Sequence, residues 1–381
     1  MMRHGFYPSK WLLLGSLLYG LTAVAASDVP ASASTSPLPE TRPAEASSLP
    51  ESQPDGPAPF IGVILPLQSR QLGPVADAIK AGINAAVATD GKYGPAVRFY
   101  PANEQTDDVL FVYRQAQEEG ARAIIGPLTK PAIAQLVRSN LAMLPTLALN
   151  TPDNGVQPPA TLYSFGLGIE QEARQIARQA WAEGKRRALS LALDNAFGKR
   201  LQTAFNEEWK RLGGELTELT LAVNRPNYSQ VRSLIEEQPP ELAFLAVDAR
   251  RAKLLRPYLG ELPLYATSQI SNGRPNSGTM RSLAGLSYVE MPWFLEPQRP
   301  EIVRYPRPAR PLHIDLERMY ALGIDAWRLA SFLVGPPPAR LTLEGVSGRI
   351  ELTATRQLQR QPSPVIVGAA GDEDPDPAEP Q

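Results

Sequence analysis

Apolar residues in the middle of the chain, from residue 60 to about 360, follow two alternating patterns. Short, nearly continuous apolar runs such as Phe60-Ile61-Gly62-Val63-Ile64-Leu65 are typical of strands covered on both faces. Between these runs, apolar residues recur every three or four positions, as in Val75, Ile79 and Ile83, and predict amphipathic helices. Strands that alternate with helices favour parallel sheets with helices on both faces.

The alternation occurs twice along the chain. The first series runs from the strand over 60–65 to an apolar segment over 146–149. The second begins with a helix that carries Ala173 and Ile176 and continues to a short strand over 263–266. We therefore predict an α/β fold of two lobes, each a mainly parallel sheet with helices on both faces.

A strongly apolar helix is expected over 316–334, after the second series. Since no strand pattern lies beside it in the sequence, we expect the chain to return to the first lobe before this helix and to cross again near Gly335. The domain boundaries then follow. The folded region spans 60–360, with a first lobe of about 60–150 and 270–335 and a second lobe of about 160–265 and 338–360.

The N-terminus has the three parts of a secretory signal peptide over 1–26. A basic start precedes the apolar stretch 11–21, and Ala23-Val24-Ala25 supplies the small residues of a cleavage site. An uncleaved membrane anchor is the alternative, but about a dozen apolar residues are short for roughly 30 Å of hydrocarbon. We expect export to an oxidising compartment.

Two segments that flank the folded region have a different composition. Residues 27–59 are rich in Pro, Ala and Ser, and residues 361–381 form an acidic tail. Neither contains enough large apolar side chains to offset its ordering entropy, so we predict a disordered spacer and a disordered tail. Docking of a proline-rich motif to a partner is the alternative for both.

Composition excludes several kinds of chemistry. The 381 residues include no cysteine, so a disulfide framework, a cysteine nucleophile and a cysteine-linked lipid are excluded. A net charge of −1 gives no overall field that would attract nucleic acid. Gly166-Leu167-Gly168 lacks the third glycine of a dinucleotide loop, and a turn is the simpler interpretation. His313 beside Asp315 suits a surface position at a helix start better than a general base. We expect no enzymatic activity, no metal and no cofactor.

Several stretches together resemble a known family. They are Phe60–Leu67, Ile125–Leu128, Leu147–Pro152, Phe205–Gly214, Leu264–Ser268, Leu316–Trp327 and Leu343–Gly348. Their order and spacing are similar to the C-terminal domain of the LpoA (LppC) family of penicillin-binding protein activators. The resemblance covers about residues 60–360. It departs from the well-known members in two respects, because this chain has no cysteine to acylate and has the proline-rich spacer in place of a large helical N-terminal domain.

The resemblance implies a fold and a function. The fold is that of type 1 periplasmic solute-binding proteins, two α/β lobes joined by three crossovers. The function is that of a non-enzymatic periplasmic regulator of peptidoglycan synthesis, which binds and activates a class A penicillin-binding protein. The alternative is a periplasmic receptor of the ABC-transporter type for a small polar ligand.

For either function, loop residues and one aromatic pair are the candidate contacts. A ligand of this fold lies between the lobes, where strands end and helices begin. The corresponding hydrogen-bonding residues are Gln68, Ser69, Thr129, Asn150, Thr151, Asn195, Thr267 and Ser268, with Lys130 as the nearby cation. Trp293 and Phe294 open a proline- and arginine-rich stretch and are the partner-contact candidates. Packing of both rings against the lobe junction is the alternative.

Overall fold

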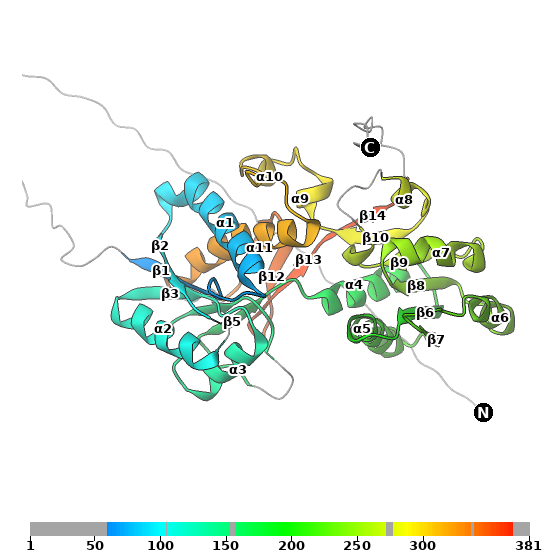
Figure 1. Cartoon of the computed structure of the whole chain (residues 1–381), viewed down its shortest axis with the longest axis horizontal. Helices are drawn as coiled ribbons and strands as arrows, with labels where there is room; N and C mark the ends of the chain where they lie inside the picture. Colours follow the sequence, from blue (N-terminus) through cyan, green and yellow to red (C-terminus); the bar gives the residue numbers. More distant parts are fainter. Residues whose placement is uncertain (1–58, 104, 153–156, 272–276, 337–338, 369–381) are drawn as a thin grey trace, which may run out of the picture. The chain divides into compact units, whose positions relative to one another are not determined.

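Two β-sheets organise the computed structural model, which describes residues 59–103, 105–152, 157–271, 277–336 and 339–368. The predicted signal peptide, nearly all of the predicted spacer and most of the predicted tail lie outside these ranges. Each sheet has helices on both faces (Figure 1), so the predicted α/β fold of two lobes is confirmed.

The sheet of the first lobe has the strand order β11-β12-β13-β5-β4-β3-β1-β2. Its neighbours from β13 to β2 pair in parallel, whereas β11, β12 and β13 form an antiparallel ribbon at one edge. The strands are β1 (Phe60–Leu65), β2 (Ala96–Pro101), β3 (Ala121–Ile125), β4 (Thr146–Ala148), β5 (Leu162–Phe165), β11 (Thr342–Gly345), β12 (Gly348–Leu352) and β13 (Gln357–Gln361).

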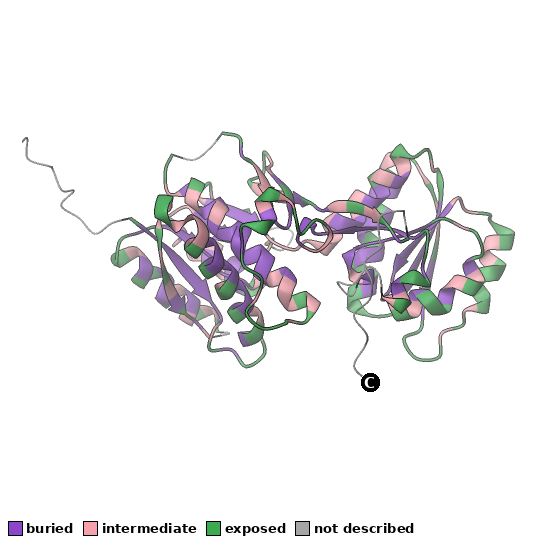
Figure 2. Ribbon diagram, turned by 90° about the horizontal axis from the view of Figure 1, so that it is seen from above, coloured by how far each residue is buried: buried purple, intermediate pink, exposed green. Residues whose placement is uncertain are grey.

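Two apolar layers enclose this sheet, which explains the unbroken apolar run of β1. The central strands of the sheets are largely buried (Figure 2). Ile61, Val63 and Leu65 pack under one helix layer, while Phe60 and Ile64 pack under the other. The first layer consists of α1 (Gly73–Asp90) and α11 (Ile314–Leu333), and the second of α2 (Thr106–Glu118) and α3 (Lys130–Arg138). The short helix η1 (Gly91–Tyr93) follows α1.

The sheet of the second lobe has the order β14-β10-β9-β8-β6-β7 and is parallel except at β14. Helices α4 and α5 cover one face, and α6, α7 and α8 lie on the other. The elements are α4 (Ile169–Ala182), β6 (Arg187–Leu193), α5 (Ala196–Leu212), β7 (Glu215–Leu221), α6 (Ser229–Glu237), β8 (Leu242–Ala246), α7 (Ala249–Leu259), β9 (Leu264–Ala266), η2 (Ser268–Ile270), α8 (Gly278–Arg281), β10 (Ser287–Glu290) and β14 (Ser363–Ile366).

The chain passes between the two sheets after β5, after β10 and after β13. After β10, the short helices α9 (Pro292–Leu295) and α10 (Pro300–Val303) lead to α11, which packs on α1 as expected for the first lobe. The expected crossing near Gly335 is wrong, because β11, β12 and β13 join the first sheet and the chain crosses only at Pro362. Residues 338–360, expected in the second lobe, therefore belong to the first wherever they form strands.

The predicted disordered tail is also wrong at its start. Ser363–Ile366 forms β14, which pairs antiparallel with β10 at the edge of the second sheet. The pairing supplies backbone hydrogen bonds that the side-chain composition of this segment does not reveal. The rest of the predicted tail, from residue 369, lies outside the described residues.

Candidate functional site

A groove of about 880 Å³ lies between first-lobe loops and the helices α4 and α5 of the second lobe. From the first lobe it is lined by Lys130 at the start of α3, by residues 149–152 and by Met319 of α11. From the second lobe it is lined by Arg174 of α4 and Arg200 of α5, among others. Its size is that of a site for a small molecule.

Ion pairs already engage much of the charge in this groove. Arg174 lies 3.2 Å from Glu207, and Arg200 pairs with Glu170 through a hydrogen bond of 2.8 Å from its Nε. Both pairs join α4 to α5 within the second lobe. These four charged side chains of the groove wall are thus paired with one another, while Lys130 and Lys199 also line the groove.

Two of the eight predicted ligand residues, Asn150 and Thr151, line this groove. Asn150 Nδ2 donates to the carbonyl of Leu128 at 3.3 Å, which fixes the loop after β4. Lys130, the predicted nearby cation, lines it as well. Ligand contact at these positions stays a prediction.

The other six lie elsewhere. Thr129 and Asn195 cap α3 and α5, where their side chains accept from backbone N–H groups. Ser69 is buried and its Oγ accepts from the N–H of Leu72. The remaining three are Gln68, which is exposed, and Thr267 and Ser268, which are buried just after β9 in the second lobe, beside the passages between the lobes.

At these passages a chain of buried polar contacts runs from one lobe to the other, and we call it the hinge network. Its members are Asp325, Ser347, Arg360, Glu172, Ser268, Arg318 and Glu290. Every member is at most 7% exposed. Burial of so many charged groups is rare unless each is paired.

One half of the hinge network centres on Glu172, in the first turn of α4. Its carboxylate binds the guanidinium of Arg360 on β13 and accepts from the N–H of Ser268 at 3.0 Å. Arg360 Nη1 in turn donates to the carbonyl of Ser347 at 3.0 Å. A single carboxylate of the second lobe is thereby tied to the edge ribbon of the first sheet.

The other half centres on Arg318 of α11. Its Nη2 donates to Glu290 at the end of β10 and to the carbonyl of Ser268, both at 2.7 Å. Burial raises the pKa of the Glu290 carboxyl, and the adjacent Arg318 opposes that rise. Ser268 therefore joins both halves, through its N–H to Glu172 and through its carbonyl to Arg318.

Asp325 anchors the end of the hinge network in α11. It is fully buried and accepts hydrogen bonds from the N–H groups of Val346 at 3.0 Å and Ser347 at 2.9 Å, and from Ser347 Oγ at 2.6 Å. Burial raises the pKa of Asp325, while Arg328 at 3.2 Å and these hydrogen bonds oppose the rise. The turn between β11 and β12 is thus fixed on α11.

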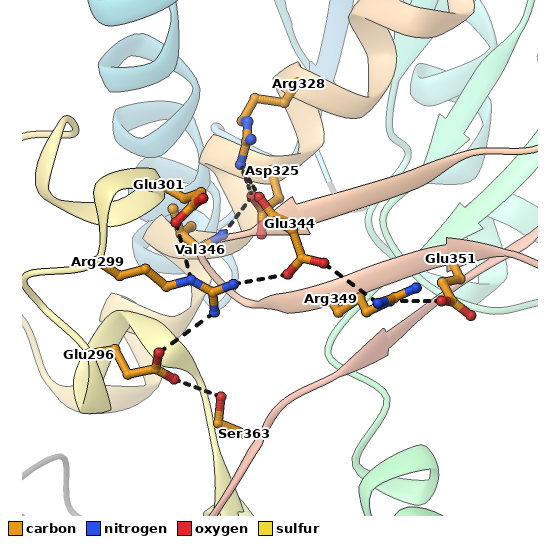
Figure 3. Close-up of polar contacts among 10 residues, drawn as sticks. All are labelled: Glu296, Arg299, Glu301, Asp325, Arg328, Glu344, Val346, Arg349, Glu351 and Ser363. Carbon is orange, nitrogen blue, oxygen red and sulfur yellow. Dashed lines mark hydrogen bonds and ion pairs between the residues drawn. The ribbon is translucent and has the colours of Figure 1, made fainter.

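A second group of charges lies on the surface beside this turn, and Figure 3 shows it together with Asp325, Arg328 and Val346. Arg299 contacts Glu301 at 3.1 Å and Glu344 at 3.0 Å, which ties the start of α10 to β11. Glu296 accepts from Ser363 Oγ at 2.9 Å, next to the last passage between the lobes. Exposed pairs of this kind contribute about 0–1 kcal/mol each, so the buried contacts dominate.

Trp293 is not available as a partner anchor, because its side chain is fully buried. Its Nε1 donates to Glu317 at 2.9 Å, and the guanidinium of Arg307 lies 3.8 Å from its ring centre. Phe294 is half-buried and packs against the core of the first lobe. The prediction that Trp293 contacts a partner is therefore wrong, and for Phe294 partner contact stays a prediction. Both rings pack on the core of the first lobe.

Other candidate chemistry is limited. His313 is exposed, and its Nδ1 accepts from the N–H of Asp315 at the start of α11, as a capping residue does. In the part of the chain that the structure describes, His, Asp and Glu side chains form no group of three suited to a metal ion. Within the same ranges, no helix combines the length and apolar character that crossing a membrane requires.

A family model described as "LppC putative lipoprotein" matches residues 56–363, which contain both lobes and the hinge network. The chain belongs to the LppC family. Among curated relatives, the penicillin-binding protein activator LpoA of Enterobacter sp. (strain 638) is 29% identical over 317 residues, which are 71% of this chain and 43% of that protein. LpoA of Klebsiella pneumoniae is 28% identical over 64% of this chain and 40% of its own length. This LppC-family chain thus spans less than half of these relatives.

Solved structures show the same fold. The C-domain of LpoA from Haemophilus influenzae, "a regulator of PBP1A", aligns with a TM-score of 0.67 at 22% identity over 81% of this chain and 97% of that domain. A protein of Chromobacterium violaceum named as a "putative branched-chain amino acid ABC transporter" aligns with a TM-score of 0.70 at 35% identity over 81% of this chain and 99% of that one. The LppC-family chain therefore has the type 1 periplasmic-binding fold, as its sequence predicted.

Proposed function

We propose that this chain is a non-enzymatic periplasmic regulator of peptidoglycan synthesis, which binds a class A penicillin-binding protein and stimulates its crosslinking reaction. The observation that carries the proposal is membership of the LppC family together with LpoA activators at 28–29% identity. In the groove, Arg174 and Arg200 pair with Glu207 and Glu170, as is typical of charges that stabilise the helices α4 and α5 against each other.

The proposal assigns the regulatory task to the two lobes themselves. The LpoA relatives match this chain over only 40–43% of their length, so the matched part is what the proposal relies on. The solved Haemophilus influenzae domain that this chain resembles is the C-domain of LpoA, "a regulator of PBP1A". Contacts to the synthase then come from exposed residues of the lobes, and the buried Trp293 is excluded from them.

A capture experiment tests this proposal. The chain is immobilised, exposed to detergent-solubilised envelope proteins of its own source, and the retained proteins are identified by mass spectrometry. We expect a class A synthase to be enriched over a transpeptidase of another class, which serves as the matched control. Equal recovery of the two, or recovery of neither, would contradict the proposal.

The second candidate function is a receptor for a small polar solute. The likeness to the Chromobacterium violaceum protein at 35% identity and the groove of about 880 Å³ favour it. Under this function Asn150 and Thr151 contact the solute from the first lobe. The name of the Chromobacterium violaceum protein points to leucine, isoleucine and valine as the first solutes to test.

Calorimetric titration with these amino acids separates the two functions. A saturable heat that disappears in a Thr151→Val variant, with Thr203→Val at another groove position as the comparison, would support the receptor. Absence of heat with both the parent chain and the variants would remove it. Capture of a transporter permease in place of a synthase would favour the receptor independently.

A further inference from the structure

The hinge network contacts each of the passages between the lobes. Glu172 lies at the start of α4, soon after the passage that follows β5. Glu290 is the last residue of β10, where the second passage begins, and Arg360 lies on β13, just before the third. Any rotation of one lobe against the other changes the backbone at these three places, so it also moves these three side chains.

We propose that the hinge network is a latch that holds the two lobes in one orientation. The chain then presents a single rigid surface to its partner and does not open and close as a solute receptor does. This inference concerns the mechanics of the fold and goes beyond the proposed function, since it stands whether or not a synthase is the partner.

The pairs that cross between the lobes are the most buried ion pairs among the described residues. The side chains of Glu172 and Arg360 are each 3% exposed, and those of Arg318 and Glu290 are 4% and 1% exposed. Separating them would leave carboxylates and guanidinium groups unpaired where little water reaches them. Such separation is strongly disfavoured. Separation of an exposed pair costs little, because water replaces the lost partner.

The network is also continuous, which makes its contacts break together. The N–H of Ser268 donates to Glu172 and its carbonyl accepts from Arg318, so both inter-lobe ion pairs are hydrogen-bonded to the same residue. Next to them, Gln175 of α4 donates to the carbonyl of Pro362, on the last passage, at 3.0 Å. A rotation that relieves one contact therefore strains the others.

The test uses a distance between the lobes, and the absence of cysteine from the chain makes the labelling clean. Arg138→Cys on α3 and Lys253→Cys on α7 place one spin label on an exposed position of each lobe. Double electron–electron resonance then gives the distribution of distances. The latch variant is Glu172→Gln, and Glu170→Gln is the matched control, because Glu170 lies in the same helix turn but pairs within its own lobe.

We expect a single narrow distribution for the parent chain and for Glu170→Gln. For Glu172→Gln we expect a second distance populated to at least about 10%, the upper end of what minor conformers usually reach. A distribution for Glu172→Gln that coincides with that of Glu170→Gln would overturn the proposal. Several distances in the parent chain would overturn it too, and that result needs no variant.

If circular dichroism shows that Glu172→Gln does not fold, the distances are measured in Glu290→Gln, which breaks the other inter-lobe pair. The same criterion applies: a second distance supports the latch and an unchanged distribution overturns it. The parent-chain distribution decides on its own if neither variant folds. None of these readings depends on peptidoglycan synthesis, so failure of the latch and failure of the proposed function are distinguishable.

Discussion

The helices α1 and α11 touch at two glycines, and this contact supports a quantitative prediction. A Cβ added at Gly82 would lie 1.9 Å from the carbonyl oxygen of Tyr320, and one added at Gly323 would lie 2.2 Å from that of Ile79. Both obstacles are backbone atoms of the opposite helix, so no side-chain rotation relieves them. Gly82→Ala must therefore push the two helices apart by more than 1 Å to restore an ordinary contact.

Two effects of opposite sign decide the magnitude. Alanine in place of glycine favours the helix by about 1 kcal/mol. Overpacking of a close-packed interior costs about 1–3 kcal/mol, and the upper end applies because Ile79, Ile83 and Ile324 around the contact are fully buried. We expect a net loss of about 2 kcal/mol in the free energy of unfolding, which corresponds to a melting temperature lower by about 4–8 °C.

Thermal unfolding followed by circular dichroism measures this loss. Gly278→Ala is the control, since its new Cβ would have a single neighbour, Arg281 Nη2, at 4.0 Å. Gly278 is the first residue of a four-residue helix, so this control reports a glycine-to-alanine change that meets no backbone of another helix. A melting temperature of Gly82→Ala no lower than that of Gly278→Ala would refute the close approach of the two helices.

Three further predictions concern buried and paired side chains. Asp325→Asn removes a fully buried carboxylate that pairs with Arg328 and accepts from Val346 and Ser347. Urea unfolding should therefore show that the free energy of unfolding falls by about 3 kcal/mol. A fall no larger than that of Asp315→Asn, whose side chain is 61% exposed, would contradict this prediction. Arg211 and Arg178 lower the pKa of Glu208 from 4.5 to about 2. The ionised Glu208 therefore contributes about 1 kcal/mol, after solvent screening, to the free energy of unfolding above pH 4.5, and this contribution is lost as the pH falls towards 2. Glu208→Gln should therefore flatten the dependence of stability on pH in that window, and parallel curves for parent and variant would argue against the pairing. Trp293→Ala should lose about 3–5 kcal/mol because it empties a buried site, whereas an unchanged melting temperature would show that the ring is not part of the core.

The sequence predicts the fold class well because the deciding signal is local. In β1 every residue is buried, as the unbroken apolar run of its sequence predicts. Helix ends can be predicted from the sequence as well. The glycine pair after α5 predicts the end of that helix, where Gly213 adopts a φ of 93°. Periodicity over ten to twenty residues thus determines the elements and their rough order.

Which sheet receives a late strand is not a local property. The segment Thr342–Leu352 has the pattern of a hairpin, and nothing within it distinguishes the first lobe from the second. Its place depends on β13 pairing with β5, a contact between residues 357–358 and 164–165. The lobe boundaries could therefore not be predicted from the pattern alone.

The hinge network was missed for a similar reason. Glu172 and Arg360 are 188 residues apart, so no spacing links them. A weak signal was present, since Glu172 lies on the apolar stripe of α4 beside Ala173 and Ile176, and Asp325 lies among the buried residues of α11. A charge on a buried stripe indicates a buried pair without naming its partner.

The central claim, that this chain regulates a peptidoglycan synthase, is tested most directly by the synthase's own product. The purified class A penicillin-binding protein of the same source is supplied with lipid-linked precursor, with and without a molar excess of the chain. Crosslinked peptide dimers are then quantified by chromatography after digestion of the glycan. The account predicts a higher crosslinked fraction when the chain is present and no effect after the chain is heat-denatured. An unchanged crosslinked fraction at saturating chain would contradict it.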